Sequence, residues 1–152
     1  MKYTVRFAHL EHVPELDIGD VLKRGDVIGI MGSTGQSTGA HLHIDCVVGE
    51  VKKPFKLADI GSRYAPAQKQ LNYFIDSELF KCKPIITTHF MDASYRKQFC
   101  KDHPAIDVVP FDATKKTIYW NRSFIGVVTN LVYQPESYGH CLYVMFDTDR
   151  KQ

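Results

Sequence analysis

Short runs of β-branched, aromatic and aliphatic residues, separated by turn residues, are the feature that most constrains how this chain folds. In KYTVRFAHL, residues 2–10, Tyr3, Val5 and Phe7 alternate with Thr4 and Arg6. A period of two is typical of a half-buried β-strand. Similar runs occupy residues 40–48, 84–90, 105–111, 116–120, 123–133 and 140–146. The sequence therefore predicts a mostly β, antiparallel fold.

The middle of the chain has a different composition. Between Pro54 and Lys83 it mixes proline, lysine and glutamine with scattered aromatic residues. Leu71, Phe74, Ile75 and Leu79 are spaced i, i+3, i+4 and i+8, which predicts one short amphipathic helix that connects the β regions and packs on the sheet. A chain of 152 residues suits a single domain.

Composition argues against several classes of partner. The formal net charge of +2 is too small to indicate a nucleic-acid-binding surface. No apolar run approaches the roughly 18 residues that cross a bilayer, so membrane insertion is not expected. The start, MKYTVRFAHL, does not resemble a signal peptide, so we expect that a target outside the cell would require separate delivery.

The cysteines predict neither a structural zinc ribbon nor a disulfide framework. None of the four shows CxxC spacing, and a chain of this length does not need covalent staples. We expect free thiols at Cys46, Cys82, Cys100 and Cys141.

The stretch GSTGQSTGAHLHIDC, residues 32–46, carries the strongest chemical signal. It is not a phosphate loop, because Gly39 is followed by Ala40 and His41 rather than by lysine, and the stretch leads into a strand rather than a helix. On a strand, His41 and His43 point to the same face. The two imidazoles could bind one metal ion together, or one could bind it while the other acts on the substrate.

Asp45 continues along the face of His41 and His43. It is either an acceptor that orients one imidazole or a solvated carboxylate.

A catalytic zinc usually takes three protein ligands and leaves a position open. The best source of the remaining ligands is HPAIDVVP, residues 103–110. His103 and Asp107 offer an imidazole and a carboxylate four residues apart, at the entry to an apolar run.

These motifs together resemble the lysostaphin-type zinc endopeptidases, which cleave peptidoglycan peptides. GDVLKRGDVIGIMGSTGQSTGAHLHIDC resembles the second half of that family's pattern, and RFAHL resembles the segment that carries another active-site histidine. HPAIDVVP resembles the family's H-x-x-x-D motif, and SFIGVVTNLVYQPESYGHCLYVMF resembles the strands that follow it.

The order of these segments differs from the family, where H-x-x-x-D comes first. The resemblance implies one circularly permuted domain, residues 1–152, with the family's second half at 1–50, a connection at 51–84 and the first half at 85–152. The first and last strands should then pair as a hairpin, since a cut at an exposed loop tip is tolerated. Alternatively, the two halves belong to different domains, and sites are completed between two chains.

The resemblance also implies roles for individual residues. His103, Asp107 and His43 would be zinc ligands, and His41 and His9 would be catalytic residues that do not bind the metal. Such a zinc ion polarises a peptide carbonyl and activates water. Three further residues are candidates for substrate binding: Tyr95, whose spacing departs from that of a family tyrosine, and Gly32 and Gly39, in a groove wall.

The predicted function is a zinc-dependent endopeptidase that cleaves cross-links or stem peptides of bacterial peptidoglycan. It would act at the cell wall, outside the cell, as a phage-borne enzyme delivered with other virion or lysis proteins, or as part of a larger protein. The alternative is a catalytically silent cell-wall-binding or virion structural module with the same fold. A lipoyl or biotinyl carrier is disfavoured, because no lysine occupies a suitable hairpin tip.

Overall fold

The computed structural model describes residues 1–51, 65–99 and 103–152. Most of the described chain is β-strand, with short helices between the strands. The strands are β1 (Lys2–Leu10), β2 (Val21–Leu22), β3 (Val27–Ile30), β4 (Leu42–Val48), β5 (Pro84–Thr88), β6 (Ile106–Pro110), β7 (Thr117–Tyr119), β8 (Phe124–Gln134) and β9 (Gly139–Lys151). The helices are the 3₁₀ turn η2 (Ala65–Ala67), α2 (Gln68–Asn72) and α3 (Ala93–Phe99). The mostly β prediction is confirmed.

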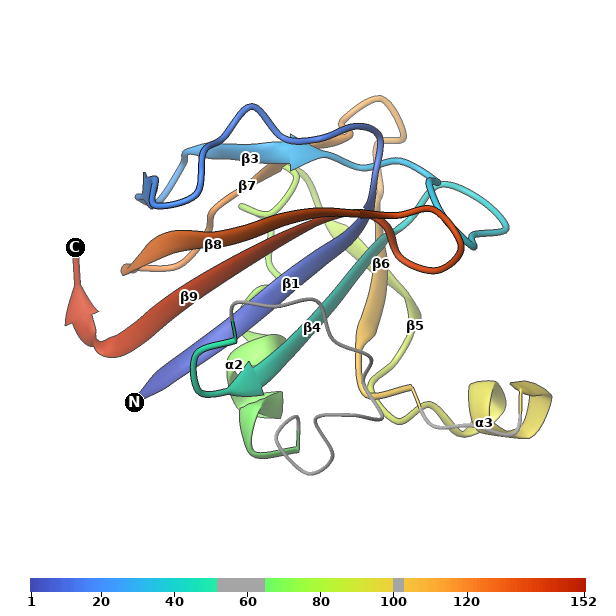
Figure 1. Ribbon diagram of the computed structural model, residues 1–152. Helices are drawn as coiled ribbons and strands as arrows, with labels where there is room; N and C mark the ends of the chain where they lie inside the picture. The colour runs from blue at the N-terminus through green and yellow to red at the C-terminus, as the bar shows by residue number, and fades with distance from the viewer. Residues whose placement is uncertain (52–64, 100–102) are drawn as a thin grey trace.

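One seven-stranded sheet dominates the molecule, in the order β2-β8-β9-β1-β4-β6-β5. Its neighbouring strands all pair antiparallel. Figure 1 shows β9, β1 and β4 lying side by side, with the two-stranded sheet of β3 and β7 at one end. The predicted antiparallel arrangement is therefore confirmed.

The two ends of the chain meet in this sheet, as expected from the sequence. β1 pairs with β9 in a register that runs from Lys2 opposite Asp147 to Phe7 opposite Leu142. The ammonium group of Met1 lies 3.1 Å from Asp147 Oδ1 and 2.8 Å from Asp149 Oδ2. The first and last strands thus form the centre of the sheet together.

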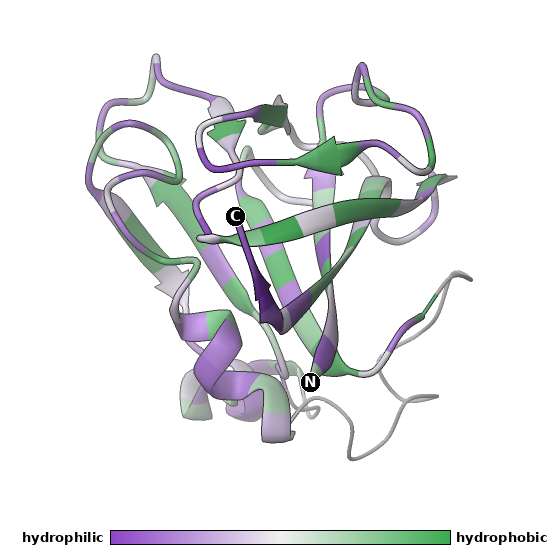
Figure 2. Ribbon diagram, turned by 90° about the vertical axis from the view of Figure 1, so that its left-hand side faces the viewer, coloured by the Kyte–Doolittle hydropathy of each residue, from purple (hydrophilic) through white to green (hydrophobic). Residues whose placement is uncertain are grey.

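The larger hydrophobic core lies on one face of the sheet. Tyr3, Val5 and Phe7 from β1 contribute to it, as the period of two predicts. The ring of Phe146 on β9 lies at its centre, 5.7 Å from the ring of Phe74 and 5.9 Å from the ring of Trp120. Figure 2 shows the corresponding alternation of hydrophobic and hydrophilic residues along the central strands.

The opposite face of β1 is also buried, which corrects the expectation of a half-buried strand. Thr4, Arg6 and Ala8 are each at most 1% exposed. Ala8 packs with Cys141 and Tyr143 from β9 in a second, smaller cluster. The polar side of the sequence pattern therefore faces an interior rather than solvent, and this interior contains the site described below.

The predicted connecting helix is shorter than its apolar spacing suggested. The α-helix ends at Asn72, yet Leu71, Phe74 and Leu79 are all buried in the core. The amide of Asn121 donates to the carbonyl of Phe74 (2.7 Å), which a longer helix would use for the amide of Glu78. That amide donates instead to Asp76 Oδ1 (2.9 Å). These side-chain contacts replace the helical ladder with turns.

The cysteines and the expected absence of a membrane-spanning segment can also be compared with the structure. Cys46, Cys82 and Cys141 are free thiols, as predicted, whereas Cys100 lies outside the described residues. Among the residues that the structure describes, no helix has the length and apolar character needed to cross a membrane.

Candidate metal centre

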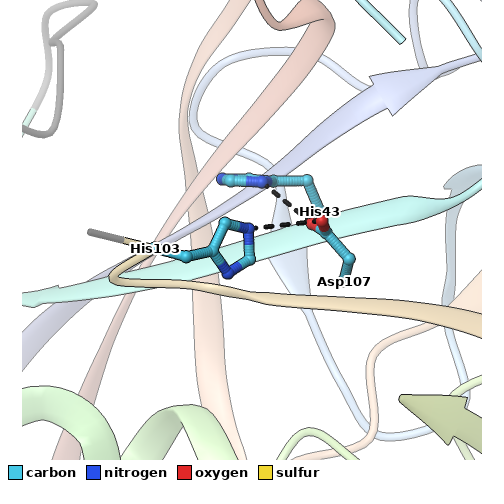
Figure 3. A group of neighbouring side chains, drawn as sticks. All are labelled: His43, His103 and Asp107. Atoms are coloured by element: carbon cyan, nitrogen blue, oxygen red, sulfur yellow. Dashed lines mark hydrogen bonds and ion pairs between the residues drawn. The ribbon is translucent and has the colours of Figure 1, made fainter. Parts of the chain in front are cut away.

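Sheet register brings the H-x-H motif and the H-x-x-x-D motif together. His43 on β4 lies directly opposite Asp107 on β6, and its Nδ1 is 3.1 Å from Asp107 Oδ1. His103, just before β6, places its Nε2 3.2 Å from Asp107 Oδ2. One ligand atom from each of the three residues lies within 4.8 Å of the others. Figure 3 shows both imidazoles directed at the carboxylate.

Each imidazole in this group is oriented through its far nitrogen. His103 Nδ1 donates to the carbonyl of His89 (3.2 Å), and His43 Nε2 contacts Asp45 Oδ2 (2.8 Å). Asp45 is fully buried, so it is an acceptor for an imidazole and not a solvated carboxylate. Such contacts fix which nitrogen of a histidine is left for a metal.

The carboxylate of Asp107 is stabilised in its charged form. Burial opposes its ionisation, but the hydrogen bonds from His103 and His43 outweigh that cost and hold its pKa well below the usual range. Burial likewise opposes the charged form of His43, yet hydrogen bonds to Asp107 and Asp45 raise the pKa of His43 to about 9. Without a metal, the charged imidazole of His43 is thus held between the carboxylates of Asp107 and Asp45.

The donor set fits a zinc ion. Two imidazole nitrogens and one carboxylate converge, and each imidazole has a hydrogen-bond partner behind it. His43 and His103 are 6% and 5% exposed. A cation at this point would replace the protons that now bridge the three side chains.

The two remaining predicted histidines flank this group. The ring of His9 lies 4.8 Å from the ring of His41 and 5.9 Å from the ring of His43. His41 Nε2 lies 3.8 Å from Asp107 Oδ1. His9 adopts a left-handed backbone (φ 61°) at an irregularity in the β1–β9 pairing, which turns its side chain towards the site.

Backbone carbonyls orient both of these imidazoles. His9 Nδ1 is 2.7 Å from the carbonyl of Thr34, and His41 Nδ1 is 2.9 Å from the carbonyl of Gly39. A carbonyl only accepts, so each Nδ1 carries a proton, and the neutral form of each ring then has its lone pair on Nε2. Burial lowers the pKa of His9 to about 4, so its imidazole is neutral at physiological pH.

The substrate-binding candidates occupy three different environments. The ring of Tyr95, on α3, lies 4.6 Å from the ring of His103. Gly39 is exposed, and its carbonyl holds His41. Gly32 is buried, and a Cβ there would fall 2.5 Å from the Cα of Glu11. Gly32 therefore allows the chain to pass close to the end of β1.

Two residues near the site are not among the candidates predicted from the sequence. The ring of Tyr138, in the β8–β9 turn, lies 5.4 Å from the ring of His43 and 6.3 Å from the ring of His9. Arg6 lies beneath that tyrosine, with its guanidinium 4.0 Å from the ring centroid. Only the pairing of β1, β4 and β9 places them there. The polar position of Arg6 in an alternating strand was the one available hint.

The glycine-rich loop, residues 32–40, is fastened to the β8–β9 turn. The amide of Gln36 donates to the carbonyl of Ser137 (2.7 Å), and the amide of His140 donates to Thr34 Oγ1 (3.1 Å). A Cβ at Gly35 would collide with the backbone of Gly139, and a Cβ at Gly139 would collide with Thr34. The carbonyl of Thr34 that holds His9 is therefore fixed by a direct backbone contact between two loops.

Comparison with known proteins agrees with this geometry. Residues 1–57 match the model of Peptidase family M23. No solved structure matches the chain. The matched segment contains His9, His41 and His43, whereas His103 and Asp107 lie beyond it. The N-terminal third of the chain is thus similar to the metallopeptidases of family M23, and the fold brings His103 and Asp107 to the matched His43 to complete a buried His-His-Asp group.

Proposed function

We propose that the protein is a zinc-dependent endopeptidase that hydrolyses cross-links or stem peptides of bacterial peptidoglycan. The observation that carries this proposal is the convergence of His43, His103 and Asp107, with two further imidazoles beside them. The similarity of residues 1–57 to family M23, whose peptidases act on the cell wall, supports the substrate class.

His43 Nδ1, His103 Nε2 and the carboxylate of Asp107 would hold the zinc ion. Zinc in this position would supply Lewis-acid chemistry for the hydrolysis of a peptide bond. With Zn²⁺ bound, both imidazoles would be neutral and Asp107 would contribute one negative charge, so the centre as a whole would keep a positive charge. Its hydrogen-bonded surroundings keep the three ligand atoms in place before the ion arrives.

His41 is suited to accept the proton of the attacking water. Its Nε2 is the nitrogen that bears the lone pair in the neutral ring, faces the metal group, and belongs to a side chain that is 19% exposed. His9 is more deeply buried and neutral, and its Nε2 would accept a hydrogen bond from water or from an N–H of the substrate. In this division of roles, His41 transfers the proton, and His9 orients the water or the substrate.

We further propose that residues 1–152 form one circularly permuted domain. The pairing of β1 with β9, and the contacts between Met1 and two carboxylates near the end of the chain, support it. The ligand group also supports a single domain, because β4 and β6, which pair to form it, belong to the same chain.

The proposal is tested with purified peptidoglycans of different cross-link types. Zinc-loaded protein should release fragments whose masses identify one cleaved peptide bond, and His41→Ala should release none while retaining zinc. Zinc binding by the wild type without any cleavage would favour the silent cell-wall-binding module instead. Absence of zinc binding would contradict the metal site itself.

A further inference from the structure

A buried arginine lies behind the metal group. Arg6 and Asp45 are both 0% exposed, and Arg6 donates from Nη2 to Asp45 Oδ2 (2.6 Å) and from Nε to both carboxylate oxygens (3.2 Å each). The planar guanidinium thus grips the carboxylate along one edge. The same Oδ2 atom lies 2.8 Å from His43 Nε2.

We propose that Arg6 is a positioning residue for the metal centre. Its guanidinium fixes the carboxylate of Asp45, and that carboxylate fixes the ring of His43 with Nδ1 turned towards Asp107 and His103. This inference rests on the proposed zinc site, and it adds a residue that never touches the metal or the substrate.

Three adjacent strands hold Arg6 at this level. Arg6 on β1 lies directly opposite Asp45 on β4 and Tyr143 on β9. Arg6 Nη1 donates to the hydroxyl of Tyr143 (3.3 Å), and the ring of Tyr138 covers the guanidinium at 4.0 Å. The series of contacts from Arg6 through Asp45 to His43 therefore runs from β1 to β4 and ends at a predicted metal ligand.

A contribution to stability does not explain this arrangement. A buried ion pair must recover a large desolvation cost, and well-packed apolar residues often serve as well or better. What an apolar pair could not provide is an acceptor at fixed position for His43 Nε2. The geometry points to orientation of the ligand as the function of the pair.

Arg122 provides a matched comparison within the same protein. It is also buried, at 6% exposure, and its guanidinium lies 5.0 Å from the ring centroid of Phe74. Its side chain bonds Gln70 and none of the residues of the metal group. A general effect of removing a buried arginine should therefore appear at both positions, whereas an effect on the metal should appear only at Arg6.

The experiment compares the wild type with Arg6→Met, Arg6→Lys and Arg122→Met. Zinc affinity is measured by competition with a chelator, and cobalt absorption spectra report ligand geometry. We expect Arg6→Met to lower zinc affinity by about 10–100-fold and to alter the cobalt spectrum, as removal of contacts behind a ligand does elsewhere. Arg6→Lys keeps the charge but not the two-point grip, so it should weaken binding too. Arg122→Met should bind both ions as the wild type does.

The outcomes separate this inference from the proposed function. Wild-type affinity and an unchanged spectrum in a folded Arg6→Met or Arg6→Lys protein would overturn the role of Arg6 while leaving the zinc site intact. Loss of affinity in Arg122→Met equal to that in Arg6→Met would do the same. If Arg6→Met does not fold, Arg6→Lys decides the question. A wild type that binds neither ion overturns both proposals, and a wild type that binds zinc without hydrolysing peptidoglycan affects only the proposed function.

Discussion

His43 and Asp107 are 64 residues apart in the chain but lie directly opposite each other on β4 and β6, with Nδ1 and Oδ1 3.1 Å apart. Opposed residues on antiparallel strands share one face of the sheet. The register therefore places the carboxylate next to the imidazole without any loop rearrangement. Strand pairing in the sheet thus brings His43 and Asp107 together, and His103 reaches Asp107 from the residues just before β6.

Removing any of the three ligands should release the metal. His43→Ala, His103→Ala and Asp107→Ala each delete one of three donors, so zinc retention after gel filtration should fall to background in metal analysis. His12→Ala is the control, because that side chain is exposed. Full zinc retention by any of the three variants would contradict the assignment of that ligand.

The neighbouring histidine should behave differently. His41→Ala leaves all three donors in place, so zinc content should match the wild type, while kcat/KM on a peptidoglycan peptide should fall by about 100-fold or more. If His41→Ala loses zinc as fully as His43→Ala, the division of roles within the H-x-H motif is wrong.

The metal-free protein should lose stability in mildly alkaline solution. The pKa of His43 is raised from 6.5 to about 9 in the folded state, so its stabilising contribution is complete below pH 6.5 and is lost as pH rises to about 9. Urea unfolding of chelator-treated protein at pH 6, 7.5 and 9 measures this. His43→Gln should flatten the dependence, whereas His12→Gln should keep it. A free energy of unfolding that stays constant across this window in the wild type would refute the charged pairing of His43.

The contact between the two loops should be sensitive to a single methyl group. Gly139→Ala places a Cβ against Thr34 at a backbone φ of 64°, so it should lower both the unfolding free energy and the activity. Gly19→Ala is the control, since Gly19 also has a positive φ (96°) but no atom within 4 Å of an added Cβ. The control should lose roughly 1–3 kcal/mol from backbone strain and keep its activity. Equal activities in the two variants would show that the contact does not position His9.

The permuted arrangement makes a prediction about connectivity. A chain in which residue 152 is joined to residue 1 by a short glycine-serine linker, and which is opened within residues 52–64, should retain zinc and activity. Joining is favoured because the Met1 ammonium already lies 2.8 Å from Asp149. A monomeric rearranged protein that binds no zinc would contradict the single-domain proposal, and activity that appears only in a dimer would favour sites completed between chains.

Local sequence patterns predict the strands and the ligand candidates well, because alternation and motif spacing depend only on residues that are close in the sequence. KYTVRFAHL forms β1, and His41, just before β4, and His43, on β4, both direct their side chains to Asp107. Burial of Arg6 was not predictable in this way, since a polar residue in an alternating strand normally faces solvent. Its partners come from elsewhere in the chain: Asp45 lies on β4, and Tyr138 lies in the β8–β9 turn. The helix after Ala67 was overestimated because Asn121, distant in sequence, takes the carbonyl of Phe74.

The backbone contact between Gly35 and Gly139 has a consequence for engineering the specificity of this enzyme. Gly139 at the β8–β9 turn lies so close to Gly35 and Thr34 of the glycine-rich loop that neither glycine has room for a Cβ. Neither loop can be lengthened, exchanged or randomised alone without moving the carbonyl that holds His9. Libraries or grafts intended to redirect cleavage should therefore transplant the two loops as one unit, with both glycines retained.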